Sequence, residues 1–269
     1  MFDKSLLTIA GTDPSGGAGI QVDLQVFRDW GYHGLSTITA IVTQSTQGVK
    51  SFDPCRGALL RGQIDTILED IPVAGIKIGM LPTLESVETV ADFLSEYERM
   101  HDVPVVIDTV LTSGEGDVEL ARLGAAEAML DTLLGHADLV TPNRPELERL
   151  TGRTIADRED AEQACLELLE CGCGAVLFKS GHMERHSDAV HVSDLLVTAD
   201  GTVTWLDPLE RIDADVHGTG CQLSSAICAA LADGLSVLEA AEASREYLNE
   251  LLHTSVQDIG QGRPVIVRT

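Results

Sequence analysis

Short apolar runs alternate with amphipathic stretches along most of this chain, and this alternation constrains the fold more than any other feature. We expect strands at Ser5 to Ala10, Leu35 to Val42, Gly75 to Met80, Val105 to Val110, Asp138 to Thr141 and Ala175 to Lys179. Several are apolar on consecutive residues, which is typical of parallel strands covered on both faces. Between them, apolar residues recur at helical spacing, as from Ala161 to Leu169. The pattern predicts an α/β fold with a doubly wound, mostly parallel sheet flanked by helices.

The last third of the chain departs from this alternation. Asp194 to Thr198 and Thr202 to Leu206 flank a turn-like Ala-Asp-Gly sequence, which predicts an antiparallel hairpin at one edge of the sheet. Two helices are expected after it, over Gly218 to Leu231 and Val237 to Leu252. Since no linker rich in Pro, Ser or Gly interrupts the sequence, we expect residues 1–269 to form a single domain.

The charge balance restricts the partners of the protein. The 269 residues include 43 Asp and Glu against 18 Lys and Arg, a formal net charge of −25. Such a surface repels phosphate backbones and anionic lipid heads, so we expect neither a nucleic acid nor a membrane as partner. An acidic surface with very few lysines suits a halophilic, salt-rich cytoplasm. An acidic protein of an ordinary cytoplasm is the alternative.

Other features agree with a cytoplasmic location. No apolar run approaches the roughly 18 residues of a membrane span, and the start MFDKSLLTIAG lacks the basic segment and cleavage site of a signal peptide. Six cysteines in a chain of this length do not form a dense disulfide framework, so we expect them to be reduced. Cys171 and Cys173 lack a second pair at zinc-finger spacing, which favours simple burial over a zinc site.

A glycine-rich turn from Gly11 to Gly19 follows the first expected strand. Glycines allow a ligand to approach the backbone closely. The segment lacks the Lys-Ser/Thr ending of a P-loop and the full spacing of a dinucleotide fingerprint. Taken alone, it is interpreted as a tight structural turn.

The segment His217-Gly218-Thr219-Gly220-Cys221 leads into an expected helix. Exposed backbone N–H groups and the positive end of a helix can hold developing phosphoryl charge, so we expect an anion hole here. A thiol at a helix start tends to have a lowered pKa, and its thiolate could accept a proton. The structural alternative for Cys221 is a small buried side chain.

Oxygen-bearing side chains follow other expected strands. Asn143 and Glu146 lie three residues apart at a predicted helix start, where they suit Mg²⁺ or its waters. Ordinary helix-start chemistry explains this segment equally well. Asp108 and Lys179 add a carboxylate and a cation at strand ends, where ligand sites of doubly wound sheets lie.

Seven separated blocks together resemble one family. GTDPSGGAGIQVDL, TAIVTQSTQGV, KIGML, VVIDTV, TPNRPE, GCGAVLFKSGH and HGTGC have the order and approximate spacing seen in the hydroxymethylpyrimidine and hydroxymethylpyrimidine phosphate kinases of thiamine synthesis, within the ribokinase superfamily. The resemblance runs from about Leu6 to Ala232. HGTGC alone is also similar to a pyridoxal kinase of related type.

The resemblance implies a ribokinase-like fold and roles for particular residues. At the substrate, Asp23 and Gln44 would bind the aminopyrimidine, and Gly11 and Met80 would line its pocket. A carboxylate can accept from an exocyclic amine, an amide can donate and accept at a ring edge, and a thioether can pack on the ring.

The resemblance likewise implies ATP and Mg²⁺ as cofactors. The implied roles are ATP phosphate binding for Asn143, Glu146 and Lys179, Mg²⁺ placement for Asp108 and Glu146, and an anion hole for Gly218, Thr219 and Gly220. Cys221 stands where most ribokinase-like sugar kinases carry a catalytic Asp. The chain departs from the family pattern at Ser113 to Gly116, where relatives often have a longer loop containing Lys.

Together these features predict a kinase that phosphorylates 4-amino-5-hydroxymethyl-2-methylpyrimidine with MgATP and then phosphorylates the monophosphate to the diphosphate. We expect it to be a homodimer. A pyridoxal or pyridoxine kinase is the nearest alternative, and Gln44 beside Asp23 favours the aminopyrimidine. A non-catalytic pyrimidine sensor is the other alternative, against which the intact phosphate motifs argue.

Overall fold

An eight-stranded sheet forms the centre of the protein in a computed structural model, which describes residues 4–99, 101–113, 118–182, 191–210, 212 and 214–268. Its strands are β1 (Ser5–Ala10), β2 (His33–Ile38), β5 (Ile76–Ile78), β6 (Val105–Ile107), β9 (Leu139–Val140), β10 (Ala175–Phe178), β12 (Leu195–Thr198) and β13 (Val203–Trp205). Their order is β13-β12-β10-β9-β6-β5-β1-β2; near one edge β12 pairs antiparallel with both β10 and β13, and the other neighbouring strands are parallel. The predicted fold class and edge hairpin are confirmed.

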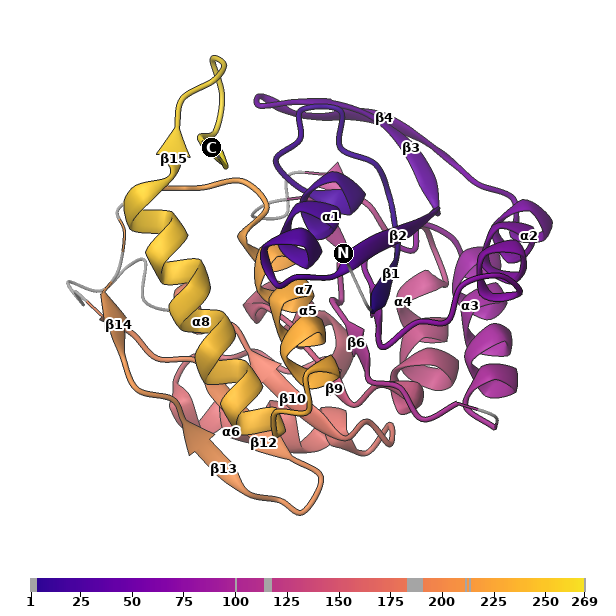
Figure 1. Ribbon diagram of the computed structural model, residues 1–269. Helices are drawn as coiled ribbons and strands as arrows, with labels where there is room; N and C mark the ends of the chain where they lie inside the picture. Colours follow the sequence, from indigo (N-terminus) through magenta and orange to yellow (C-terminus); the bar gives the residue numbers. More distant parts are fainter. Residues whose placement is uncertain are drawn as a thin grey trace.

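Helices cover both faces of this sheet (Figure 1). They are α1 (Gly19–Asp29), α2 (Gly57–Leu68), α3 (Leu84–Tyr97), α4 (Ala125–Ala128), α5 (Arg144–Thr151), α6 (Arg158–Leu169), α7 (Thr219–Ala232) and α8 (Val237–Thr254). On one face α1, α7 and α8 pack together, and on the other face α2, α3, α4 and α6 do so. None of the helices in the described part of the chain combines the length and apolar character needed to span a membrane.

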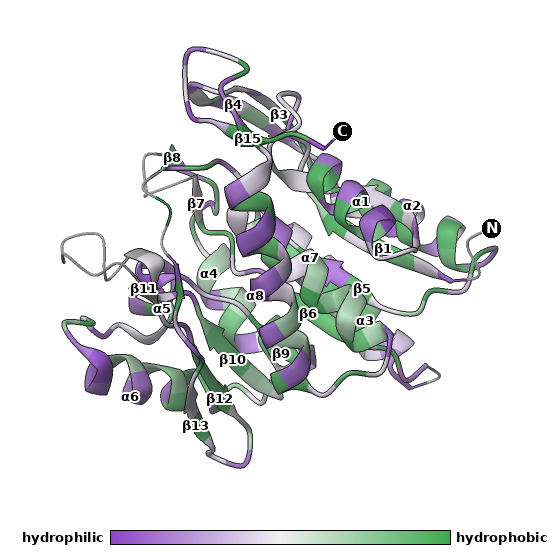
Figure 2. Ribbon diagram, turned by 60° about the vertical axis from the view of Figure 1, so that its left-hand side comes forward, coloured by the Kyte–Doolittle hydropathy of each residue, from purple (hydrophilic) through white to green (hydrophobic). Residues whose placement is uncertain are grey.

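The central strands are buried on both sides, which explains their consecutive apolar residues. On β1, Leu6 belongs to the core under α1, α7 and α8, whereas the next residue, Leu7, belongs to the core under α2 and α3. Leu177 and Phe178 divide in the same way on β10. Figure 2 shows the hydrophobic colour along β5, β6 and β10. Burial of each such side chain contributes about 1.5–3 kcal/mol, so the two cores fix the sheet between its helices.

The expected strand from Leu35 to Val42 is wrong in one respect, because the chain leaves the sheet at Thr39. The Thr39 N–H donates to the Ala10 carbonyl, and its Oγ1 donates to the Met80 carbonyl at 2.6 Å. After this anchor the chain forms a separate hairpin of β3 (Ala40–Ser45) and β4 (Gly48–Pro54). The hairpin extends past the carboxyl ends of β1 and β5.

Three further two-stranded elements lie outside the main sheet: β7 (Thr112–Ser113) with β8 (Val118–Glu119), β11 (His191–Val192) with β14 (Leu209–Glu210), and β15 (Val256–Gln257) with β16 (Val265–Ile266). The C-terminal β15–β16 hairpin reaches the β3–β4 turn, where the Arg263 N–H donates to the Thr46 carbonyl at 2.8 Å. Figures 1 and 2 show the two hairpins side by side. No sequence pattern predicted this C-terminal contact.

Candidate active site

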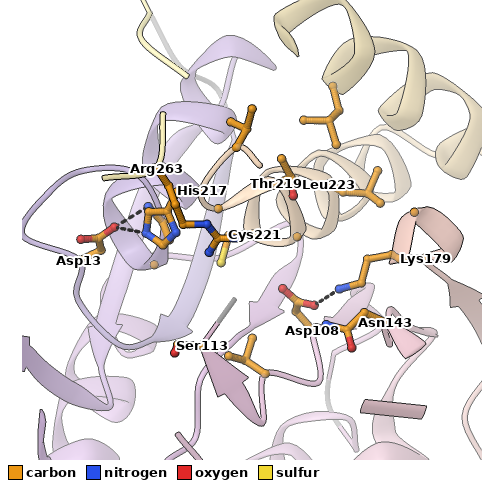
Figure 3. A pocket seen from close by; sticks show the side chains of 18 of the residues that line it. Asp13, Asp108, Ser113, Asn143, Lys179, His217, Thr219, Cys221, Leu223 and Arg263 are labelled. Carbon is orange, nitrogen blue, oxygen red and sulfur yellow. Dashed lines mark hydrogen bonds and ion pairs between the residues drawn. The ribbon is translucent and has the colours of Figure 1, made fainter. Parts of the chain in front are cut away.

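A cavity of about 680 Å³ opens at the carboxyl ends of the parallel strands (Figure 3). Residues at the ends of β1, β5, β6 and β10 line it: Gly11, Asp108 and Lys179 directly follow β1, β6 and β10, and Met80 lies two residues after β5. Because parallel strands all end at the same edge of a sheet, these four side chains and backbones meet although they are distant in sequence. Helix α7 and the β3–β4 hairpin supply other walls.

Buried charges form one end of the cavity. Lys179 Nζ donates to Asp108 Oδ1 at 2.8 Å and lies 3.9 Å from Glu146 Oε2. Asp108 is 2% exposed and Glu146 4%. The structure therefore brings together three residues that the sequence analysis singled out for ATP or Mg²⁺.

Asn143 and Glu146 also cap helix α5. The Glu146 N–H donates to Asn143 Oδ1 at 3.0 Å, and the Asn143 N–H donates to Glu146 Oε2 at 2.9 Å. This reciprocal capping box satisfies two otherwise unpaired backbone donors. Both residues nevertheless line the cavity, so helix capping and ligand contact are compatible here.

The two carboxyl groups titrate differently. Burial alone raises the pKa of Asp108, but Lys179 and Lys77 outweigh it and hold that pKa below its usual value. Burial raises the pKa of Glu146 to about 7, opposed by Lys179 and reinforced by repulsion from Asp108. Asp108 is therefore ionised at neutral pH, whereas Glu146 keeps its proton to a higher pH than an exposed carboxyl group does.

These carboxyl groups fit Mg²⁺ chemically. A dication would offset the repulsion between Asp108 and Glu146, and oxygen ligands are those that Mg²⁺ prefers. No group of three or more metal-ligating side chains occurs among the described residues. The ion would therefore need phosphate oxygens and waters as its other ligands. The same finding gives no support to a zinc site at Cys171 and Cys173.

The glycine-led loop lies directly over this charged group. Gly218 has a φ of 78° and precedes α7, and a Cβ on it would lie 1.8 Å from the Gly17 carbonyl oxygen. Only glycine fits such an approach. A Cβ on Gly220 would lie 3.3 Å from Lys179 Nζ and 3.4 Å from Asp108 Oδ2. The free N–H groups at the start of α7 thus face the same space as the lysine, an arrangement suited to an anion.

The expected low pKa of Cys221 is wrong for this structure. Cys221 lies in the first turn of α7 and lines the cavity, as predicted. Burial raises its pKa to about 11; Lys77 opposes the rise, and the carboxylates of Asp23 and Asp108 add to it. Desolvation and two nearby negative charges outweigh the helix start, so the side chain is a thiol at neutral pH.

Three of the four residues expected at the substrate line the other end of the cavity: Gly11, Gln44 and Met80. A Cβ on Gly11 would lie 3.0 Å from Met80 Sδ, so the glycine leaves room for the thioether. Val42 and Leu120 belong to the same apolar cluster as Met80. This end suits a flat ring that packs on a thioether and aliphatic side chains.

Asp23 is the exception, because the structure does not place it in the cavity wall. Its side chain is 0% exposed, and Lys77 Nζ lies 2.9 Å from both carboxylate oxygens. Thr8 Oγ1 donates to Oδ2 at 2.6 Å, and Ser225 Oγ donates to Oδ1 at 2.8 Å. All three partner side chains are fully buried, and of the three only Lys77 also lines the cavity. Asp23 joins α1, β1, β5 and α7 beneath the site, and the substrate proposal below omits it.

The sequence analysis missed several residues in the cavity wall. His217 was quoted within its motif without a role, yet it contacts both Gln44 and Asp13. Arg263 lines the cavity and pairs with Asp215, and no pattern around it indicated this position. Ser113 also lines the cavity, whereas residues 114–116 of the departing loop lie outside the described residues.

An anion loop at a helix start and a buried lysine beside two carboxyl groups are parts that phosphoryl-transfer enzymes use. The family model described as phosphomethylpyrimidine kinase matches residues 13–265. The chain therefore belongs to the phosphomethylpyrimidine kinase family, and the predicted family and enzyme class are confirmed.

Individual relatives agree with this assignment. The hydroxymethylpyrimidine/phosphomethylpyrimidine kinase of Rhizobium meliloti is 37% identical over 260 residues, covering 96% of this chain and 94% of the relative. The enzyme of the same name from Haemophilus influenzae is 36% identical over 262 residues, covering 96% of this chain and 94% of that one.

Solved structures show the same fold. The ADP complex of Bacillus subtilis pyridoxal kinase superposes with a TM-score of 0.86 at 29% identity, over 98% of this chain and 96% of that one. The phosphomethylpyrimidine kinase of Clostridium difficile superposes with a TM-score of 0.79 at 35% identity, over 92% of this chain and 99% of that one.

Proposed function

We propose that this kinase transfers the γ-phosphoryl group of MgATP to the primary alcohol of 4-amino-5-hydroxymethyl-2-methylpyrimidine, and then to the resulting monophosphate. The observation that carries the proposal is the division of one cavity into two chemically different ends. Gly11, Gln44 and Met80 line one end, and the Asp108–Lys179 pair lies at the other. Residues of the loop before α7 line the same cavity.

At the substrate end, the chain supplies packing and hydrogen bonds. Met80 and Val42 contact the faces of the ring, and the Gln44 carboxamide pairs with the ring edge. In this pose the hydroxymethyl group points toward Cys221. The role of these side chains is to hold the alcohol in line with the γ-phosphorus, which is where much of the rate of a phosphoryl transfer comes from.

At the phosphate end, Lys179 and the N–H groups at the start of α7 stabilise the transferring group, and Asn143 contacts the nucleotide phosphates. Asp108 and Glu146 would hold Mg²⁺, which would supply positive charge against the phosphate oxygens. The oxygen of the alcohol bonds to the γ-phosphorus as the bond between that phosphorus and the bridging oxygen of ADP breaks. Cys221 first loses its own proton to solvent, and its thiolate then accepts the proton of the alcohol. Among the residues of this chain, Lys77 favours that ionisation, because its charge lowers the pKa of Cys221.

A pyridoxal kinase activity is a second candidate. The Bacillus subtilis pyridoxal kinase gives a higher TM-score than the Clostridium difficile enzyme, although its sequence identity is lower. The preference for an aminopyrimidine was expected from Gln44 and Asp23 together, but Asp23 lies outside the cavity wall. Gln44 alone carries that selection.

A product assay tests these proposals. Hydroxymethylpyrimidine, its monophosphate and pyridoxal are offered separately with MgATP, and products are identified by mass spectrometry. We expect the monophosphate and diphosphate of the pyrimidine, with pyridoxal phosphorylated more slowly. Faster phosphorylation of pyridoxal would favour the second candidate. Binding of the pyrimidine without any product would favour a sensor. A Lys179→Met variant controls for contaminating kinases, and light scattering tests the proposed homodimer.

A further inference from the structure

Three side chains from distant segments meet at the substrate end of the cavity. Asp13 comes from the glycine-rich loop after β1, Gln44 from β3 and His217 from the loop before α7. His217 Nε2 lies 2.9 Å from Asp13 Oδ2 and 2.7 Å from the Gln44 carboxamide, at the atom placed as Nε2. Figure 3 shows Asp13 and His217 facing each other at one side of the site.

Asp13 acts in this group as a fixed acceptor. Its Oδ2 accepts the N–H groups of Gly17 and Ala18, and its Oδ1 accepts the N–H and Oγ–H of Ser15. Burial alone would raise the pKa of Asp13, but hydrogen bonds from His217 and Ser15 outweigh it and hold that pKa below its usual value. The carboxylate has no proton to give, so the contact with the imidazole requires an N–H on His217 Nε2.

The same nitrogen also contacts Gln44, and this decides the orientation of the amide. An imidazole nitrogen carries either a proton or a lone pair. Since His217 Nε2 carries the proton, an amide NH₂ at 2.7 Å would bring two donors together. The oxygen and nitrogen of a carboxamide have nearly the same shape, so hydrogen-bond partners determine which is which. When the amide oxygen of Gln44 faces His217, the single N–H on Nε2 is shared between that oxygen and Asp13 Oδ2, and both contacts join a donor to an acceptor.

We propose that Asp13 and His217 are positioning residues that turn the Gln44 oxygen toward the imidazole and its NH₂ group into the cavity. The inference rests on the proposed function and sharpens its substrate class. A fixed NH₂ donor selects heteroaromatic alcohols whose ring edge offers an unprotonated nitrogen. It disfavours rings that present a C–H or N–H at the same place, because the donor would then be left unpaired.

The first test needs no substrate. Nitrogen-15 NMR of the unliganded protein with labelled histidine reports which ring nitrogens of His217 carry protons, and the His217→Ala variant assigns its signals. We expect a proton on Nε2. A bare Nε2 with the proton only on Nδ1 would overturn the proposed orientation, because Gln44 could then donate to it.

The second test is a double-mutant cycle on pyrimidine binding, measured by calorimetry. We expect His217→Ala to weaken binding about tenfold in the parent, as loss of one ordered hydrogen bond does. In the Gln44→Ala background the same change should alter the dissociation constant less than about threefold, since the residue acts through Gln44. A tenfold loss in both backgrounds would sink the positioning role and indicate general damage to the loop. His101→Ala, a substitution of an exposed histidine beside Tyr97, is the control.

A third variant isolates the donor. Gln44→Glu keeps an oxygen toward the imidazole but has no NH₂ group for the ring, so it should bind the pyrimidine as weakly as Gln44→Ala. Binding like the parent would overturn the assignment of the NH₂ to the cavity. If the parent itself binds no pyrimidine, the proposed function fails, and the NMR measurement still decides the orientation of Gln44.

Discussion

The two ends of the cavity are built on different principles. At the phosphate end, Asp108 and Lys179 directly follow strands of the main sheet, and buried ionic contacts hold them together. At the substrate end, Gln44 lies on a hairpin outside the sheet and contacts a loop residue, His217, through a polar hydrogen bond. The first end is fixed by the sheet itself, and the second by contacts between connecting segments.

This difference separates the residues for phosphoryl transfer from the residues that select the ring of the substrate. Charged side chains at the ends of sheet strands keep their positions whatever ring is bound, and transfer of a phosphoryl group requires such fixed positions. Hairpins and loops can differ between related enzymes without disturbing the sheet. We therefore expect changes at the phosphate end to affect turnover, and changes at the substrate end to affect affinity for the ring.

The largest expected effect is on turnover, from Cys221→Ala. General-base assistance contributes on the order of 10²- to 10⁴-fold, so single-turnover phosphoryl transfer should fall by such a factor with ATP affinity nearly intact. Cys221→Asp should retain more activity, since a carboxylate can accept the proton. Cys55→Ala, at a cysteine outside the cavity wall, is the control. A transfer rate within about threefold of the parent would remove Cys221 from the mechanism.

The pH profile gives a second test of the same residue. Because burial raises the pKa of Cys221 to about 11, the thiolate fraction increases about tenfold per pH unit below that value. Above pH 8, Glu146, with a pKa of about 7, is already ionised and adds no further change. The logarithm of kcat/KM should therefore rise with a slope near one between pH 8 and 9.5. A flat parent profile, equal to that of Cys221→Asp, would argue against thiolate catalysis.

At the substrate end, Gln44→Ala should affect binding of the ring and leave the nucleotide alone. Loss of hydrogen bonds to a buried ring edge costs about 1–3 kcal/mol, or roughly 5- to 150-fold in the dissociation constant. Calorimetry with the pyrimidine and with ATP measures both. Thr43→Ala, at an exposed neighbour on the same strand, is the matched control. Equal losses for both ligands would remove the proposed division between the two ends.

The same contrast explains what the sequence could predict. Asp108 and Lys179 were found because strand ends are visible as the limits of apolar runs, and the carboxyl ends of parallel strands share one edge. Gln44 and Met80 were predicted in addition, from the resemblance of their motifs to the family. The contact between Gln44 and His217 joins residues 173 positions apart, and the spacing of residues within a short segment cannot predict such a pair.

Asp23 and Arg263 show two other limits. Asp23 lies one helical turn after the glycine-rich segment, and the neighbouring sequence does not determine whether its side chain faces the cavity or Lys77. Its place was settled by the packing of α1 on the sheet and α7. Arg263 follows the last strong motif by many residues, in a segment whose position depends on hydrogen bonds to the β3–β4 turn.

Burial of Glu146 should be visible in stability. Because its pKa is raised from an ordinary 4.5 to about 7, its contribution to stability is fully present below about pH 4.5 and is lost as the pH rises through about 7. Glu146→Gln removes this loss. Relative to the parent, the variant should gain on the order of 2 kcal/mol between pH 5 and pH 8 in urea unfolding without Mg²⁺. Glu127→Gln, an exposed substitution, sets the baseline. If the free energy of unfolding changed between pH 5 and pH 8 by the same amount in the variant as in the parent, Glu146 would not be kept neutral by burial.

The last prediction concerns the effect of salt on stability, which is small for each surface residue and adds up over the whole surface. The net charge of −25 implies repulsion among exposed carboxylates, and the Debye length falls from about 10 Å at 0.1 M salt to about 3 Å at 1 M. The Tm should therefore rise from dilute buffer to molar KCl. Buried pairs such as Asp108 and Lys179 are screened much less, so Glu146→Gln should show the same dependence of Tm on salt as the parent. A parent Tm that stays constant or falls would remove the idea of salt adaptation, and a flatter dependence in the variant would place the salt effect inside the cavity.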